Sequence, residues 1–196
     1  MDAAGQYALA YSLTTTAGVR AVLSLALVAV ATHVGLLHPP ALFAWLGAPL
    51  AMWALLAVAA AELLGDKIPL LDHALHVLQI VVKPAAAAII VGGTVHPQSN
   101  DMLIFLMVIG ALNALGVHAG VMTVRGASTL TTGGLANPVV STVEDAGTIG
   151  TVALAFVAPV LAAMLSICAV VLLLRIARPI KRNANARQQE RETVAR

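Results

Sequence analysis

One uninterrupted apolar stretch decides the class of this chain: Ala146–Leu174, AGTIGTVALAFVAPVLAAMLSICAVVLLL, 29 residues without a charged side chain. A helix needs about 20 apolar residues to cross the hydrocarbon layer of a bilayer. This stretch is longer, and it contains a proline, which removes a backbone donor. We therefore expect a membrane-spanning helix that tilts, or that breaks near Gly147, Gly150 or Pro159.

Four further apolar runs precede this stretch, at about 21–37, 41–64, 73–95 and 102–124, and a milder stretch at 7–19 comes before the first of them. The whole chain is 60% hydrophobic and only 10% charged, whereas soluble domains carry about 25% charged residues. The runs are continuous rather than alternating, which favours helices over a β-barrel. The sequence predicts an all-α, polytopic transmembrane bundle with five spans.

Basic residues gather after the last run. Seven of the eleven Lys and Arg lie between 175 and 196 against two Glu, whereas residues 3–174 hold four basic and six acidic side chains. Such a distribution predicts a cytoplasmic C-terminus in the inner (cytoplasmic) membrane. We expect one transmembrane domain over 1–178 and a disordered basic tail over 179–196. Nucleic-acid binding is a rival explanation of a basic tail, but this tail is short and has no aromatic residue, so the expected partner is the lipid bilayer. A second copy of the chain, in a homo-oligomer, is a further candidate partner.

Charge interrupts the apolar pattern first at residues 62–72, ELLGDKIPLLD. An ionisable group at depth costs about 3 kcal/mol and usually faces other protein or a water cavity. Glu62 and Asp66 are four residues apart, so a continuing helix places both carboxylates on one face, which suits proton binding. Alternatively Gly65 ends the helix and an interfacial turn follows. We favour the turn for Asp66 and Lys67, and a functional role for Glu62.

A polar stripe follows in the third run. Asp72, His76, Gln79 and Lys83 stand at i, i+4, i+7 and i+11, which is one helix face about 16 Å long. Such a stripe should face the protein interior. Lys83 is the deepest cation, and the alternative to a buried pair is that it snorkels to the interface. The candidate carboxylate partners are Glu62, Asp66, Asp72, Glu144 and Asp145.

The second charged segment begins at Arg125, continues through a Gly- and Thr-rich stretch and ends at Glu144-Asp145. Residues 126–145 form either a surface loop or a re-entrant or broken-helix element that lines a cavity, and a re-entrant segment would give six spans. The flanking charges favour the re-entrant element. Asn137-Pro138 predicts an N-cap followed by an N1 proline, and Ser141 with Glu144 fits a capping box.

The chain has no nucleophile elbow and no phosphate-binding loop. Two neighbouring histidines, His73 and His76, do not match the spacing of a zinc protease. We expect neither a metal nor a cofactor. A faint repeat relates Val19-Arg20-Ala21 to Val124-Arg125-Gly126 at an offset of 105 residues, and it would suggest an inverted repeat with a site at the junction of two halves.

These elements resemble a bacterial family of small integral-membrane proteins described only as a domain of unknown function. The family pattern has Gly-x-Arg-Ala, which matches residues 18–21, then acidic-x-x-x-Asp-Lys-x-Pro-x-x-Asp, which matches 62–72. The family pattern also has Thr-x-Thr-Gly-Gly-x-x-Asn-Pro-x-x-Ser-x-x-Glu-Asp late in the chain, and residues 129–145 resemble this element. Where the family has an Arg-Pro pair, this chain has Lys83-Pro84. The lysine keeps the positive charge but loses the bidentate geometry of arginine. The resemblance implies that the two charged segments share one site, and it implies no activity.

We interpret the chain as a small permease or proton-linked carrier, because balanced charges occur at depth without a nucleophile motif. One alternative is an intramembrane enzyme or a protein that handles lipid phosphates. Another is a structural protein whose charge pairs lock the bundle. The transported solute or ion is not indicated. The candidate binding residues are Arg20, Glu62, Asp66, Lys67, Asp72, His76, Lys83, Arg125, Asn137, Ser141, Glu144 and Asp145.

Overall fold

The computed structural model describes residues 1–65 and 69–194, with side chains described for 1–65, 78–176 and 178. Every described element is helical, as predicted. The elements are α1 Ala3–Val19, α2 Ala21–His33, the 3-10 helix η1 Ala41–Gly47, α3 Pro49–Gly65, α4 Pro69–Thr94, α5 Asn100–Thr132, α6 Asn137–Val157 and α7 Pro159–Val194.

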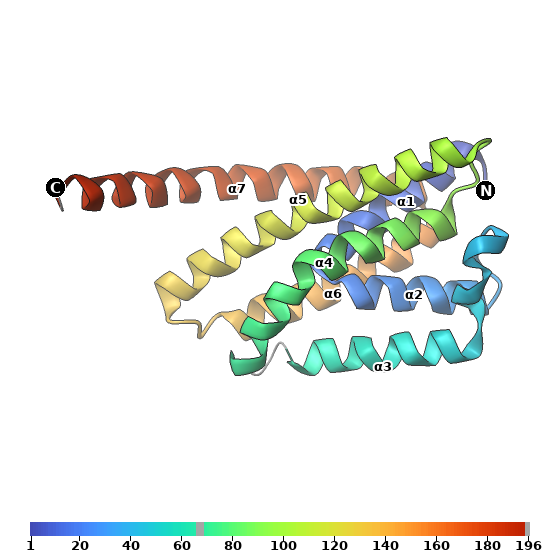
Figure 1. The fold of residues 1–196 in the computed structure, drawn as a ribbon, viewed down its shortest axis with the longest axis horizontal. Helices are drawn as coiled ribbons and strands as arrows, with labels where there is room; N and C mark the ends of the chain where they lie inside the picture. The colour runs from blue at the N-terminus through green and yellow to red at the C-terminus, as the bar shows by residue number, and fades with distance from the viewer. Residues whose placement is uncertain (66–68, 195–196) are drawn as a thin grey trace.

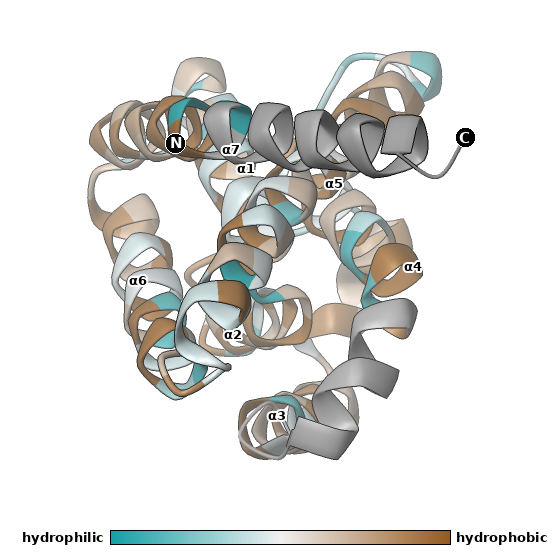
Figure 2. Cartoon of the chain, turned by 90° about the vertical axis from the view of Figure 1, so that its left-hand side faces the viewer, coloured by the Kyte–Doolittle hydropathy of each residue, from teal (hydrophilic) through white to brown (hydrophobic). Residues whose placement is uncertain are grey.

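The helices lie along the long axis of the molecule, and the two chain termini lie at opposite ends of it (Figure 1). Helix α1 occupies the centre and contacts α2, α4, α5, α6 and α7. Viewed from the end that carries the C-terminus, the other helices lie around α1 and α2, and hydrophobic residues recur along them (Figure 2). Many large apolar side chains are exposed there, as expected when the solvent is lipid.

Three helices are long and apolar enough to cross a membrane: α5, α6 and residues 159–176 of α7. The pair formed by η1 and α3, which is bent by 64°, would be a fourth span if counted as one. Helix α2 and residues 78–94 of α4 are apolar but shorter. The described part of the chain thus shows a helical protein with three or four candidate spans, and the predicted number of five or six is not confirmed.

The first run and the milder stretch before it form two separate helices that meet at Arg20. Arg20 has extended backbone dihedral angles, φ −132° and ψ 91°, between the end of α1 and the start of α2. Two residues earlier, a Cβ atom at Gly18 would lie 2.6 Å from the carbonyl oxygen of Ala114. Gly18 therefore allows α1 to touch α5, and this contact holds the Arg20 break inside the bundle.

The surface loop predicted as one alternative for residues 126–145 is wrong, because the segment is helical on both sides of a short turn. The re-entrant alternative stays a prediction. Helix α5 continues to Thr132, and α6 begins only five residues later. The turn uses Gly133 and Gly134, with φ of 63° and 88°, values that favour glycine. The helix tolerates the small polar residues because their hydroxyls donate to backbone carbonyls one turn earlier, as Thr129 does to Arg125.

The long apolar stretch breaks where predicted, since α6 ends at Val157 and α7 begins at Pro159. Helix α7 then continues to Val194, so residues 179–194, for which we expected disorder, are helical. Lys, Arg, Gln and Glu dominate this segment and are good helix formers, which accounts for the difference. The proposed repeat is not reflected in local structure, because Arg20 lies at a helix break and Arg125 lies within α5.

Candidate functional site

Residues from the Arg20 break, from the polar stripe of α4 and from the second charged segment line one small cavity between α1, α4, α5 and α6. Its volume is about 10 Å³, enough for one water molecule. Five of the lining side chains are polar or charged: Arg20, Gln79, Lys83, Arg125 and Glu144. Four of these five were predicted as binding residues, and the tertiary structure brings these four together.

Arg20 is 1% exposed and anchors one side of this cluster. Its Nη2 donates to Ser141 Oγ at 2.7 Å and to the Ser141 carbonyl oxygen at 3.3 Å. Its Nε lies 2.7 Å from Asp145 Oδ1. The extended conformation at Arg20 thus points a cation from the α1–α2 junction at α6. Ser141 lies within α6 and accepts from Arg20, so the predicted capping box is wrong; the N-cap is Ala136, and Asn137 is the first helical residue.

Glu144 is shared between two arginines. Arg125 Nε donates to Glu144 Oε1 at 3.1 Å, and Arg125 Nη2 donates to Oε2, which makes the contact bidentate. The same Oε2 lies 3.7 Å from Arg20 Nη2. Bidentate arginine–carboxylate pairs are among the strongest polar contacts in proteins. Because removing one partner of such a pair leaves an uncompensated buried charge, the three side chains form one electrostatic unit.

Lys83 is 2% exposed and does not snorkel. Its Nζ lies 2.9 Å from Nδ1 of His118, which is also buried. An ammonium group can only donate, so this ring nitrogen accepts. The partner predicted for Lys83 is a carboxylate, so the contact with His118 corrects this prediction. A histidine within the uncharged run 102–124 was the available signal for this pair.

Glu62 is buried at the end of α3, as expected, and Gln79 Nε2 donates to its Oε1 at 3.5 Å. This contact joins α3 to α4 beside Lys83. Only two members of the predicted stripe, Gln79 and Lys83, are therefore seen in the interior. Asp66 and Lys67 lie outside the described residues, and the side chains of Asp72 and His76 are likewise outside the described part.

Asn137 does not reach the cluster. Its Nδ2 donates to Thr129 Oγ1 at 3.0 Å, across the turn between α5 and α6. The contact fastens the end of α5 to the start of α6. Asn137 therefore positions the helix that carries Ser141 and Glu144.

Among the described side chains, three basic and three acidic ones gather in this region: Arg20, Lys83, Arg125, Glu62, Glu144 and Asp145. Their formal charges cancel, which is how buried charges are tolerated in an apolar bundle. No three potential metal ligands lie together in the described part of the chain. Such an arrangement can exchange protons and rearrange ion pairs.

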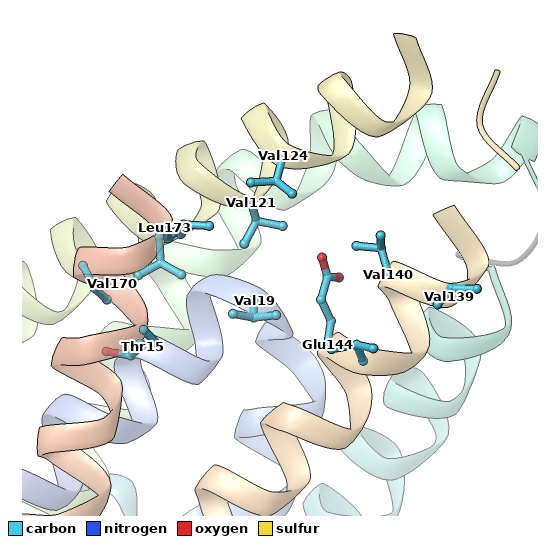
Figure 3. A pocket seen from close by; sticks show the side chains of 12 residues that line it. Thr15, Val19, Val121, Val124, Val139, Val140, Glu144, Val170 and Leu173 are labelled. Carbon is cyan, nitrogen blue, oxygen red and sulfur yellow. The ribbon is translucent and has the colours of Figure 1, made fainter. Parts of the chain in front are cut away.

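Sequence reasoning missed an apolar cavity of about 370 Å³ beside Glu144. Apart from Glu144 and Thr15, apolar residues of α1, α5, α6 and α7 line it, and Figure 3 shows the Glu144 carboxylate pointing into the space between Val121 and Val140. Valines spaced along a helix indicate ordinary packing in a sequence, so no local signal marked this cavity. Glu144 therefore lines both the small polar cavity of the charged cluster and this apolar cavity.

No curated protein and no solved structure matches the chain. A family model described as a domain of unknown function (DUF4126) matches residues 7–179. The match runs from α1 to just past the apolar part of α7 and includes the six charged residues of the cluster. The chain therefore belongs to this family of membrane-helix-like domains of unknown function.

Proposed function

We propose that the protein is a small, proton-linked carrier of the inner (cytoplasmic) membrane with a cytoplasmic C-terminus. The observation that supports this most is the charge-balanced cluster around the Glu144 cavity. Buried ionisable residues in membrane proteins characteristically line ion and substrate pathways and proton relays. A charge-balanced cluster can take up a proton without first moving a bare charge into the apolar bundle.

Glu144 is the carboxylate best placed to couple protonation to movement. Its ion pair with Arg125 joins α5 to α6, two helices that make few other contacts. A proton on Glu144 would remove the negative charge that holds Arg125, while Asp145 still neutralises Arg20. Protonation would therefore loosen one helix contact and leave the neighbouring one in place. A two-state element of this kind is what alternating access needs.

The alternative of lipid-phosphate binding has less support. Arg20 and Arg125 already contact carboxylates, and Lys83 contacts His118. An anionic head group would have to displace these partners. The purely structural alternative predicts that a double variant of Arg125 and Glu144 that recovers stability also keeps its function, whereas a carrier would lose proton flux.

Transport can be tested in proteoliposomes that contain pyranine as an internal pH indicator. An imposed pH gradient, with valinomycin and potassium clamping the membrane potential, is combined with a panel of monovalent cations, monocarboxylates, amino acids and phosphate. We expect proton flux above that of protein-free vesicles with at least one solute, and its loss in Glu144→Gln. Asp101→Asn is the matched control, because it makes the same chemical change at an exposed residue in the first turn of α5.

Transport is wrong if no solute of the panel drives proton flux above that of empty vesicles. It is also wrong if Glu144→Gln retains the full flux. Circular dichroism and size-exclusion elution of each variant show that a lost flux does not reflect unfolding.

A further inference from the structure

A third cavity adjoins Glu144. It has a volume of about 290 Å³ and lies between α1, α6 and α7. Five hydroxyl side chains line it together with Glu144: Thr15, Thr16, Thr148, Thr151 and Ser166. Glu144, Thr148 and Thr151 are spaced i, i+4, i+7, so one face of α6 carries the carboxylate and two hydroxyls.

Two of these hydroxyls lack a partner within the described part of the protein. Thr148 Oγ1 and Ser166 Oγ are buried, in side chains that are 2% and 3% exposed, and neither makes a hydrogen bond there. Threonine in a helix commonly donates to the carbonyl one turn earlier, as Thr15 does to Tyr11. Buried polar groups in native proteins are almost always satisfied, by protein or by ordered water. Ordered water in the cavity would supply hydrogen-bond partners for these two groups.

The dimensions suit water. A water molecule needs about 10–15 Å³ and two to four polar partners, and this cavity is about twenty times that size. Apolar cavities remain dry, whereas this one has a hydroxyl on each of its three helices. Its α6 lining extends from Glu144 to Thr151, and from there α6 continues toward the end of the bundle opposite the C-terminus (Figure 1).

We infer that the cavity between α1, α6 and α7 is a hydrated, hydroxyl-lined path that gives water and protons access to the Glu144 carboxylate. The inference that the path is hydrated rests on the volume of the cavity and on its hydroxyl-bearing lining. Its role as the proton route rests on the proposed function. Thr148 and Ser166 are positioning residues for water in this path.

Cysteine accessibility tests the hydration without any transport assay. Cys168, the single native cysteine, is exposed, and Cys168→Ala provides the background. Thr148→Cys and Ser166→Cys are nearly isosteric changes and should preserve the fold. Each variant is placed in lipid nanodiscs and treated with a charged, water-soluble methanethiosulfonate. Thiols react as thiolates, which need water, so modification reports hydration.

Two control positions bracket the expected result. Ile149→Cys lies beside Thr148 on the same helix but is exposed on the apolar surface, and Gln98→Cys lies in the exposed connection between α4 and α5. We expect Thr148→Cys and Ser166→Cys to react at least about tenfold faster than Ile149→Cys, because a thiol in lipid stays protonated. Gln98→Cys sets the upper limit of the rate.

Reaction of Thr148→Cys and Ser166→Cys no faster than that of Ile149→Cys would overturn the hydrated path. This result would leave the proposed carrier function standing if proton flux through Glu144 is observed. Conversely, rapid labelling without any proton flux would support the path and reject the carrier. The two proposals therefore fail separately.

Discussion

Ser141 illustrates how one small side chain can hold a buried cation. Its hydroxyl accepts from Arg20 Nη2 at 2.7 Å, and the residue is 1% exposed. Without this acceptor, part of the buried guanidinium is left unsatisfied, which costs about 1–3 kcal/mol.

We therefore expect Ser141→Ala to lower the free energy of unfolding by about 1–3 kcal/mol, measured by thermal or urea unfolding in detergent micelles. Thr142→Ala is the matched control, because Thr142 is exposed on the same helix and its hydroxyl donates to the carbonyl of Pro138 in that helix. Its effect should stay within about 0.5 kcal/mol. Equal effects of the two substitutions would contradict the role assigned to Ser141.

Gly18 acts through the absence of a side chain. A methyl group there would meet the Ala114 carbonyl oxygen and Val117 Cβ, both at 2.6 Å. We expect Gly18→Ala to destabilise the bundle by about 1–3 kcal/mol through overpacking, read from the melting temperature in detergent. Gly116→Ala is the control, because no atom lies within 4 Å of the added methyl group, and alanine is the better helix former. A Gly18→Ala variant as stable as Gly116→Ala would mean that α1 and α5 are not in tight contact.

At the scale of elements, the ion pair between α5 and α6 decides between a functional and a structural role for the cluster. Arg125→Gln and Glu144→Gln should each lower the free energy of unfolding, because each leaves a buried charge with fewer partners. The double variant should recover part of the loss, with a coupling of about 1–3 kcal/mol. Urea unfolding of the four proteins measures this coupling, and additive effects would contradict a direct pair.

The double variant also separates the two roles. A purely structural pair predicts that the recovered protein behaves like the wild type in any cellular assay. A carrier predicts that proton flux stays lost although stability returns, since the amide that replaces the Glu144 carboxylate cannot take up a proton. Recovery of both stability and flux would reject the proton-linked mechanism.

The whole molecule makes a prediction about topology. The connection that contains Gln98 and the turn that contains Leu135 lie at opposite ends of the 33-residue α5, and both residues are exposed. If the basic C-terminal segment is cytoplasmic, the turn after α5 shares its side, and Gln98 faces outward. We expect an impermeant maleimide to label Gln98→Cys in intact cells, in a Cys168→Ala background, and to label Leu135→Cys only after permeabilisation. The reverse pattern would place the C-terminus outside.

The sequence alone determined the class of the protein, because continuous apolar runs leave lipid as the only solvent that the chain can face. It also located the break at Pro159 and the buried Glu62, since proline cannot continue a helix normally and a carboxylate in an apolar run must turn inward. Arg20, Lys83, Arg125, Glu144 and Asp145 could be named as site candidates because burying a charge is costly, whereas Ser141 stood out only as a capping residue and in the family pattern. Local patterns went wrong where two readings had similar local energies, as in residues 126–145, where small polar side chains satisfied by backbone carbonyls form helix rather than loop.

Only the tertiary structure decided which of these side chains meet. Arg20 reaches Ser141 and Asp145 across more than 120 residues of sequence, and Lys83 meets His118 rather than a carboxylate. The first pairing depends on how α1 packs against its neighbours, where Gly18 allows a close contact with Ala114 of α5, and the second depends on how α4 packs against α5. The hydroxyl-lined cavity likewise combines residues of three helices. Spacing along one helix fixes which side chains share a face, but helix packing determines what that face touches.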